Sequence, residues 1–343
     1  MTSVFSAHVT SPSHSPGIRW AIRAPIIVAA VFLSVLVRAV TGEESPFEIG
    51  RALQDGTTFA LGVFIESLPF VILGILLSVV VQVWLPPRFL MRLLPRGGVM
   101  RRVVLSMLGI LLPVCECGNV PLARGLVARG LSPADSMTFL LAAPILNPIT
   151  ILATFQVFGW DGGILIARVL AGFVIANLVG SIFSLRQRQD LLLTKKFAAS
   201  CSRSHSVDSR SRTTQSFVMF AKETSAVMPA LLIGSLIAGF IQVAVERKVL
   251  LALGADPILS VFTLMILAVV ISMCSNADAF FILSLGSLFS PGAVIAFLVL
   301  GPMVDIKMIA LMRTTYTTKT VAQLVAIVVL CVAVLGLWVN YAS

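Results

Sequence analysis

The sequence carries little charge. Only 12% of its 343 residues are Asp, Glu, Lys or Arg, whereas 58% are hydrophobic, and the mean hydropathy is +1.01. Soluble domains carry about 25% charged residues, so this composition excludes an ordinary soluble protein and predicts an integral membrane protein. The glycine-rich motifs that bind nucleotide phosphates are also absent, so we do not expect the chain to use a nucleotide as its energy source.

Histidine is scarce and cysteine is odd in number. The three histidines all lie in polar segments, at His8, His14 and His205. A histidine metal or proton site within the membrane is therefore excluded. The five cysteines do not form the framework of a disulfide-rich secreted protein. We interpret Cys201, in a polar segment, and Cys331, in the last hydrophobic segment, as ordinary small side chains.

Acidic residues are outnumbered by basic ones. The chain has 25 Lys and Arg against 15 Asp and Glu, a net charge of +10. In a soluble protein this excess would suggest a nucleic-acid partner, but in a membrane protein it reports topology, because cytoplasmic loops collect Lys and Arg. The excess lies mainly in a loop at 88–102 and a linker at 185–216, so both are predicted to be cytoplasmic and no nucleic acid is expected.

Hydrophobic segments divide the chain into five parts. We expect a disordered tail at 1–18, a first transmembrane helix at 19–41, one repeat at 57–184, the basic linker at 185–216 and a second repeat at 217–341. The alternative for the first hydrophobic segment is a cleaved signal peptide. The charge pattern predicts a multi-pass membrane protein with a cytoplasmic N-terminus.

Two segments are each predicted to leave the membrane on the side from which they enter it. Three apolar segments, at 103–128, 134–158 and 162–184, separate two cytoplasmic segments, which requires an even number of crossings. Segment 103–128 contains the polar run Pro113 to Pro121, which should not continue a helix, so we interpret it as a re-entrant hairpin. Segment 258–289 is a second such hairpin from the outer side; the alternative is that all segments cross.

The two halves of the chain resemble each other. Pro69, Gly74 and Gln82 match residues 160 positions later, and Cys115 matches Cys274. Ser132-Pro133 and Asn147 match Ser290-Pro291 and Asp305 at an offset of 158. The fold class is therefore all-α, with an inverted repeat of three transmembrane helices plus one re-entrant hairpin each, after an extra N-terminal helix. Both Ser-Pro pairs should start helices that carry Asn147 and Asp305, fifteen residues on, deep into the bilayer.

Polar residues at the helix breaks are the candidate substrate-binding residues. They are Cys115, Glu116, Cys117, Asn119, Asn147, Cys274, Ser275, Asn276, Asp278 and Asp305. An ionisable residue at membrane depth costs about 2.5–3.5 kcal/mol, so the three acids are expected to serve function rather than packing. Lys307 is interpreted as a snorkelling residue, and Glu66 and Glu223 as secondary proton-relay candidates.

The cysteines of the two breaks suggest soft-ligand chemistry. Cys115, Cys117 and Cys274 could bind a thiophilic centre such as Cu(I), Zn or a trivalent arsenical, and they are the candidate metal ligands. The alternative is a redox pair formed by Cys115 and Cys117, which would make the protein an intramembrane thiol oxidoreductase.

Three runs resemble a known family. They are Leu112 to Pro121, Ala142 to Pro148 and Cys274 to Phe280. Together they resemble the ArsP/YraQ-type predicted permease family, over roughly residues 57 to 341. The resemblance implies a bacterial inner-membrane permease, which in the arsenic-linked branch exports trivalent organoarsenicals such as methylarsenite with an ion gradient. It also implies that membrane cysteines handle the arsenic.

The sequence therefore predicts a secondary transporter and not an enzyme. It should export a small thiophilic solute such as a trivalent arsenical by alternating access, with H+ as the coupling ion carried by Asp278, Asp305 or Glu116. No cofactor is expected. Its partners would be the lipid bilayer, the solute and a second copy of the chain in a homo-oligomer. Another soft metal or a sulfur-containing solute is an alternative substrate, and a permease subunit of a larger assembly, docked through the linker, is a further alternative.

Overall fold

The structure is a computed structural model. It describes residues 48–86, 94–112, 114–160, 163–203, 211–244, 256–285 and 289–342. The predicted tail at 1–18 and first transmembrane helix at 19–41 lie outside the described residues. The described residues form helices and no strand, with one isolated backbone bridge between Leu193 and Tyr316. The predicted all-α polytopic class is confirmed.

Helices account for both halves of the chain. The first half contains α2 (Glu48–Val79) with a π-helical last turn η1 (Val80–Trp84), α4 (Gly98–Leu111), α5 (Glu116–Ala128), α6 (Pro133–Ala142), α7 (Pro148–Phe158) and α8 (Ile164–Ser184). The linker contains η2 (Gln189–Leu192) and α9 (Lys195–Arg203). The second half contains α10 (Arg212–Ala244), α12 (Pro257–Ile271), α13 (Asp278–Ser284), α14 (Pro291–Met303), α15 (Ile306–Met312) and α16 (Thr318–Ala342).

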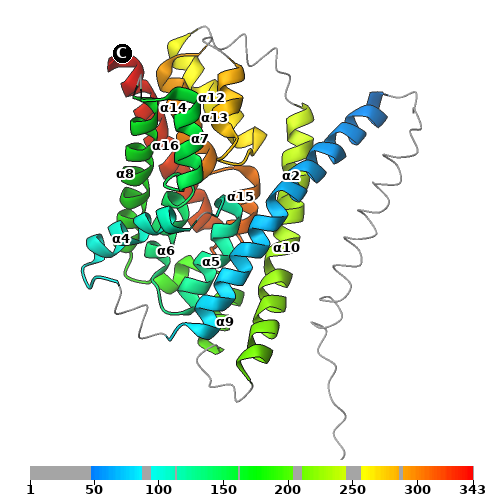
Figure 1. Ribbon diagram of the computed structural model, residues 1–343, viewed down its shortest axis with the longest axis vertical. Coiled ribbons are helices and arrows are strands. Elements are labelled where there is room, and N and C mark those ends of the chain that lie inside the picture. Colours follow the sequence, from blue (N-terminus) through cyan, green and yellow to red (C-terminus); the bar gives the residue numbers. More distant parts are fainter. Residues whose placement is uncertain are drawn as a thin grey trace, which may run out of the picture. The chain divides into compact units, whose positions relative to one another are not determined.

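Among the described residues, five helical stretches are long and apolar enough to cross a membrane. They are Leu53–Trp84, Ile164–Ser184, Arg212–Val243, Pro291–Met312 and Thr318–Ala342. The stretch formed by α14 and α15 has 72% of its most apolar window buried, against 33–39% in the other four. The protein is therefore a multi-pass membrane protein with α14 at its centre, flanked by α12 and α16 (Figure 1).

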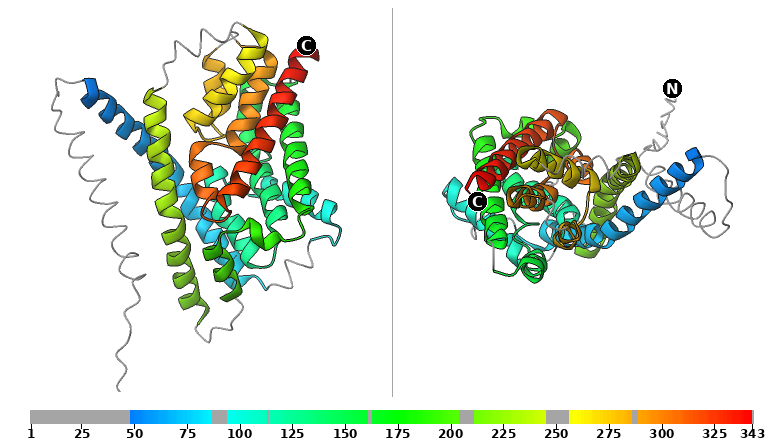
Figure 2. Two further views of the ribbon diagram at one scale, coloured as in Figure 1. Left: turned by 180° about the vertical axis from the view of Figure 1, so that it is seen from behind. Right: turned by 90° about the horizontal axis from the view of Figure 1, so that it is seen from above.

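Two long helices pack against each other on one side of this bundle. In Figures 1 and 2, α2 and α10 run side by side over much of their length. Gly56 faces the ring of Phe240, and Gly239 faces the backbone of Ala60, so small residues allow the close approach. α5 packs against the inner side of α2, and α15 packs against that of α10.

The helices that begin at the two Ser-Pro pairs are shorter than predicted. Ser132 is the N-cap of α6, as expected, and its side chain accepts a hydrogen bond from the Asp135 amide. However, α6 ends at Ala142, and Asn147 is the N-cap of the next helix, α7, because Pro144 and Pro148 prevent one continuous helix. The prediction that an unbroken helix carries Asn147 is thus wrong.

The second half repeats this break. Ser290 precedes Pro291 at the start of α14, but α14 ends at Met303. Asp305 then caps α15, and its carboxylate accepts a hydrogen bond from the Met308 amide. The matched residues Asn147 and Asp305 therefore occupy the same position, each as the cap of a new helix inside a broken span.

The predicted hairpin segments each form a pair of short helices. α4 and α5 are separated only by residues 112–115, so the break is shorter than the predicted run, and α5 continues through Pro121. α12 and α13 are separated by residues 272–277, where Ser272 takes the left-handed conformation. At both breaks a cysteine carbonyl, that of Cys115 or Cys274, accepts a hydrogen bond from the amide three residues later.

The first helix of each pair begins close to the start of the helix that follows the pair. Arg101 at the start of α4 forms an ion pair of 2.7 Å with Asp135 at the start of α6. Ser260 at the start of α12 lies 3.1 Å, between hydroxyl oxygens, from Ser290 at the start of α14. Since α5 and α13 lead directly into α6 and α14, each pair starts and finishes at one end of the molecule.

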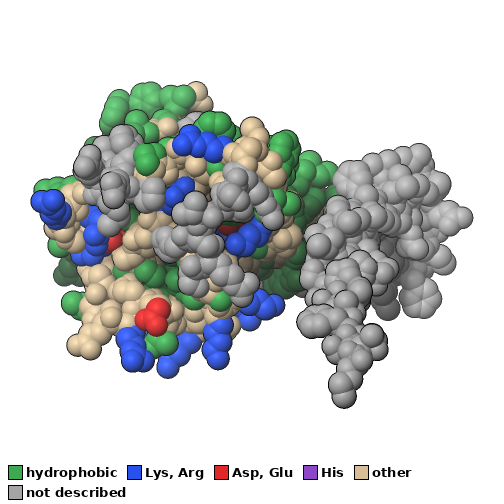
Figure 3. Space-filling model, turned by 90° about the horizontal axis from the view of Figure 1, so that it is seen from below, with side chains coloured by type: hydrophobic (Ala, Val, Ile, Leu, Met, Phe, Trp, Pro, Cys, Tyr) green, Lys and Arg blue, Asp and Glu red, His purple; other side chains and the backbone are tan. Residues whose placement is uncertain are grey.

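Basic side chains gather at the end of the molecule where α8 ends and α10 and α16 begin (Figure 3). The linker is partly folded there, because Leu192 and Phe197 are buried. The Thr194 amide donates to the Thr315 carbonyl at 2.8 Å, and the Thr317 amide donates to the Leu192 carbonyl at 3.0 Å. The described part of the linker is thus packed on the turn between α15 and α16.

Candidate functional site

Four helix breaks meet inside the protein. The Asn147 side chain donates a hydrogen bond of 3.2 Å to the Val114 carbonyl, joining the α6–α7 break to the α4–α5 break. Ser275, in the α12–α13 break, donates to Glu116 at 3.3 Å. α7 also packs against α13, and α5 packs against α15. The N-terminal ends of α5, α7, α13 and α15 therefore surround one buried region, which we call the junction.

Two carboxylates share one ammonium group at the junction. Lys307 Nζ lies 3.2 Å from Glu116 Oε1 and 3.6 Å from Asp305 Oδ2. All three residues are at most 1% exposed. The prediction that Lys307 snorkels to the interface is wrong, because its side chain turns inward to the two acids. With all three groups ionised, the cluster carries one uncompensated negative charge.

Asp278 has a separate partner. Its carboxylate accepts hydrogen bonds from both terminal nitrogens of Arg168 in α8, and the same guanidinium donates to the Thr154 hydroxyl at 2.7 Å. Arg168 is 1% exposed and Asp278 is 3% exposed. The sequence reasoning missed Arg168. An arginine within an otherwise apolar helix, in a chain with few acids, was the available signal.

The three predicted cysteines meet at the junction. Cys115, Cys117 and Cys274 are buried and free, and the Cys115 thiol interacts with the other two thiols. The ligand atoms of Cys115, Cys117 and Glu116 all lie within 4.8 Å of one another. The Cys117 thiol contacts the Ser67 hydroxyl of α2 at 3.7 Å. The compact donor set is thus Cys115, Cys117 and Glu116, which suits a soft centre, and Cys274 from the other half of the chain adds a thiol that interacts with Cys115.

The predicted amides play smaller parts. Asn147 caps α7 with its oxygen, which accepts from the Ile149 amide at 2.9 Å. Asn119 donates weakly to the Val114 carbonyl, at 3.5 Å, and its buried side-chain oxygen has no hydrogen-bond partner. Asn276 accepts from Thr150 at 3.1 Å and is the only partly exposed member of the predicted set. Thr150, which also contacts Ser275, was not predicted.

Arg124 joins four segments between the junction and the basic face. Its Nε donates to Glu223 of α10 at 2.8 Å, and a terminal nitrogen donates to the Thr314 carbonyl at 2.9 Å. Its guanidinium carbon lies 4.4 Å from the centre of the Phe197 ring in α9. Glu223, a predicted relay residue, is thus held by Arg124, whereas Glu66 lies exposed on α2.

Two further groups near the basic face are held in their neutral forms. Burial raises the pKa of Tyr316 to about 12, so its hydroxyl stays protonated and donates to Ser136 at 3.0 Å. Burial also raises the pKa of the Cys201 thiol in α9. A protonated thiol is a poor nucleophile and a poor metal ligand, which agrees with the interpretation of Cys201 as an ordinary side chain.

Comparison with known proteins identifies the family. Residues 53–341 match a family described as predicted permeases, named ArsP_1. The chain belongs to this permease family. The resemblance seen in the three polar runs is thereby confirmed, and membership favours a transporter over an enzyme. No solved structure matches the chain.

Curated relatives cover most of the same region. The chain is 31% identical over 268 residues to a putative two-component membrane permease complex subunit of Streptococcus mutans, covering 77% of this chain and 88% of the relative. It is 31% identical over 287 residues to the UPF0718 protein YcgR of Bacillus subtilis, covering 79% and 92%. It is 27% identical over 132 residues to YraQ of Escherichia coli, covering 38% and 37%.

Proposed function

We propose that this permease is a secondary transporter that exports a small thiophilic solute, such as a trivalent organoarsenical, by proton-coupled alternating access. The observation that carries the proposal is the buried donor set of Cys115, Cys117 and Glu116, whose ligand atoms lie within 4.8 Å of one another, with the Cys274 thiol interacting with that of Cys115. These thiols come from helix breaks 159 positions apart in the sequence. Polar sites at such breaks are where secondary transporters bind their substrates.

The thiol cluster suits a trivalent arsenical chemically. A monomethyl arsenic carrying two hydroxyl groups reacts with two thiols to form two As–S bonds. Two As–O and two S–H bonds break, two water molecules leave, and the oxidation state of arsenic does not change. A third thiol allows stepwise exchange of one As–S bond for another during release. A soft metal ion such as Cu(I) is the alternative solute for the same donors.

We assign the coupling proton to the acids at the junction. Asp278 has its own counter-ion in Arg168, so that pair is neutral. Glu116 and Asp305 share the single ammonium of Lys307, which leaves one negative charge buried. An unpaired buried charge is costly, so a proton on one of these two carboxyls would stabilise the cluster when no other cation is present.

The described helices support an inverted repeat of residues 57–184 and 217–341 with two re-entrant hairpins. The pairs α4–α5 and α12–α13 have matching breaks, and the broken spans α6–α7 and α14–α15 are capped at matching positions. We place the basic linker at 185–216 in the cytoplasm of a bacterial cell, with the protein in the inner membrane and its N-terminus cytoplasmic. An impermeant thiol reagent added outside the cell should label a cysteine substituted for Asp161 and not one substituted for Arg96.

Alternating access requires a closure on each side of the junction. The contacts of Arg124 with Glu223 and the α15–α16 turn close the side facing the basic end. We propose that Arg168 and Asp278 hold the second hairpin closed on the other side. Opening one closure while the other stays formed would expose the thiols to one side of the membrane at a time.

Export from cells tests the proposal. Cells that lack other arsenic exporters and produce Cys115→Ser or Cys274→Ser should accumulate trivalent methylarsenic, whereas wild-type cells should not. Cys201→Ser and Cys331→Ser are matched controls, since both remove a thiol away from the junction, and they should export normally. Full export by the Cys115→Ser and Cys274→Ser variants would exclude thiol ligation.

A further inference from the structure

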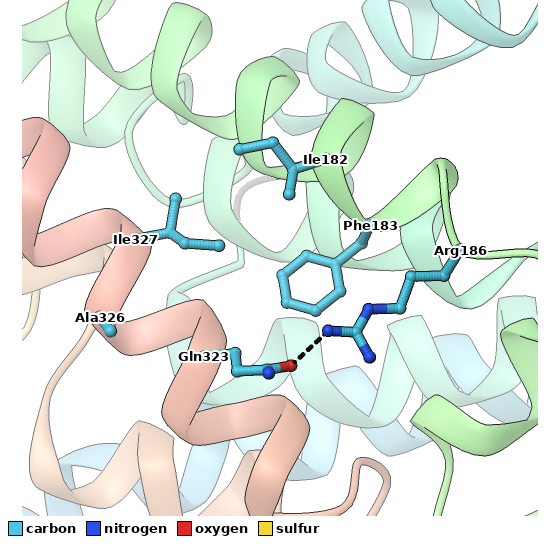
Figure 4. Close-up of a pocket in the computed structure, with 6 residues that line it drawn as sticks. All are labelled: Ile182, Phe183, Arg186, Gln323, Ala326 and Ile327. Carbon is cyan, nitrogen blue, oxygen red and sulfur yellow. Dashed lines mark hydrogen bonds between the residues drawn. The ribbon is translucent and has the colours of Figure 1, made fainter.

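A groove of about 240 Å³ lies between the end of α8 and the first turns of α16 (Figure 4). Its lining residues are Ile182, Phe183, Arg186, Gln323, Ala326 and Ile327. Four of these are apolar, and the two polar ones lie together. The groove therefore has an apolar wall and one polar end.

The polar end is an arginine without a carboxylate partner. A terminal nitrogen of Arg186 donates to Gln323 Oε1 at 2.9 Å (Figure 4), and Arg186 is exposed. Among the described residues, no acidic side chain forms an ion pair with it. Lys319, one helical turn before Gln323 on the same face of α16, is also exposed. Most of the donors of the guanidinium remain available to an anion.

The groove lies at the level where two membrane-crossing helices end. α8 ends at Ser184, just before Arg186, and α16 begins at Thr318, just before Gln323. Both helices are candidate membrane spans, and this end of the molecule carries the basic face (Figure 3). Ile182 is 41% exposed and Ala326 is exposed, so the apolar wall faces outward from the bundle, where acyl chains lie.

We propose that this groove binds an anionic phospholipid. Its phosphate would accept hydrogen bonds from Arg186, whose planar guanidinium suits two phosphate oxygens. One acyl chain would lie along Ile182, Ala326 and Ile327. Basic pockets between transmembrane helices on the cytoplasmic side are typical sites for anionic headgroups. A zwitterionic headgroup, which carries its own cation, would leave the charge of Arg186 uncompensated.

The position of the groove links lipid binding to transport. α8 is the last helix of the first repeat and α16 is the last helix of the second, so a lipid seated between them contacts both. This consequence rests on the proposed function, because it assumes that the repeats move against each other. Binding of the lipid itself does not rest on it and can be measured on the purified chain without any substrate.

Native mass spectrometry of the full chain in detergent tests the proposal. The probes are dioleoylphosphatidylglycerol, dioleoylphosphatidylcholine and soluble glycerol phosphate. The wild type should retain phosphatidylglycerol in preference to phosphatidylcholine. Arg186→Gln should weaken this retention about fivefold, the factor given by about 1 kcal/mol per basic residue at an anionic surface. Ala326→Phe, which fills the groove without changing charge, should weaken it as well.

Arg188→Gln is the matched control, because Arg188 is an exposed arginine two residues further on and does not line the groove. It should retain the lipid as the wild type does. Equal losses in Arg186→Gln and Arg188→Gln would overturn the proposal in favour of general attraction to the basic face. Binding of glycerol phosphate as tight as that of the lipid would overturn it too, and so would the absence of any preference for phosphatidylglycerol.

Discussion

Removing Arg168 should expose how much the buried ion pair contributes to the fold. Arg168 in α8 and Asp278 at the start of α13 lie 110 residues apart and contact each other through two hydrogen bonds. Both side chains are at most 4% exposed. Arg168→Met keeps much of the side-chain volume but leaves the carboxylate buried without a counter-ion, and it also removes the donor to Thr154.

The expected magnitude follows from the burial of both partners. Removing one partner of a buried ion pair costs about 3–5 kcal/mol of unfolding free energy, because the other charge stays buried and unpaired. Replacing both charges is much less costly. Arg168→Met combined with Asp278→Asn should therefore be more stable than Arg168→Met alone, with a coupling energy of about 2–3 kcal/mol, the upper end for contacting residues.

Denaturant unfolding in mixed micelles measures these differences, with the four proteins of a double-mutant cycle compared side by side. Arg188→Met, at an exposed position, should change the unfolding free energy by no more than about 0.5 kcal/mol. Additive effects of the two substitutions would mean that Arg168 and Asp278 do not stabilise each other.

Three further substitutions test separate contacts. Gly74→Ala places a Cβ against the backbone oxygen of Gly118 in α5, and thermal unfolding should show a loss of about 1–3 kcal/mol of stability. Gly62→Ala, in the same helix, meets nothing within 4 Å and should be tolerated. Arg124→Met should make Cys117 reactive toward an impermeant thiol reagent in inside-out vesicles; unchanged protection would contradict its role as a closure. Lys307→Met should abolish export and lower the yield of monodisperse protein in size-exclusion chromatography, and normal export would contradict the charge count at the junction.

Local patterns in the sequence were sufficient to predict the breaks at 112–115 and 272–277 and the polar residues there. Ser132 before Pro133 predicted a helix start, and the structure has α6 begin there. The acid Glu116 and its neighbouring cysteines stood out because charge is rare in this chain. These signals depend on neighbouring residues or on overall composition, both of which can be read directly.

Partners across the fold could not be predicted in the same way. Nothing near Arg168 in the sequence indicates Asp278, because the contact forms only when α7 packs against both α8 and α13. Lys307 lies next to the basic turn in the sequence, which suggested an interface, and only the packing of α15 against α5 reveals its burial beside Glu116. The length of α6 was overestimated, since the combined effect of Pro144 and Pro148 was underestimated.

Binding of trivalent methylarsenic to the purified chain tests whether the buried thiols are the solute site. Arsenic retained per chain can be measured by elemental mass spectrometry after removal of unbound reagent. We expect about one arsenic per chain in the wild type and in Cys201→Ser/Cys331→Ser, and almost none in Cys115→Ser/Cys274→Ser, since each arsenic needs at least two thiols of the cluster. Retention of arsenic by Cys115→Ser/Cys274→Ser at the wild-type level would mean that these thiols do not bind it.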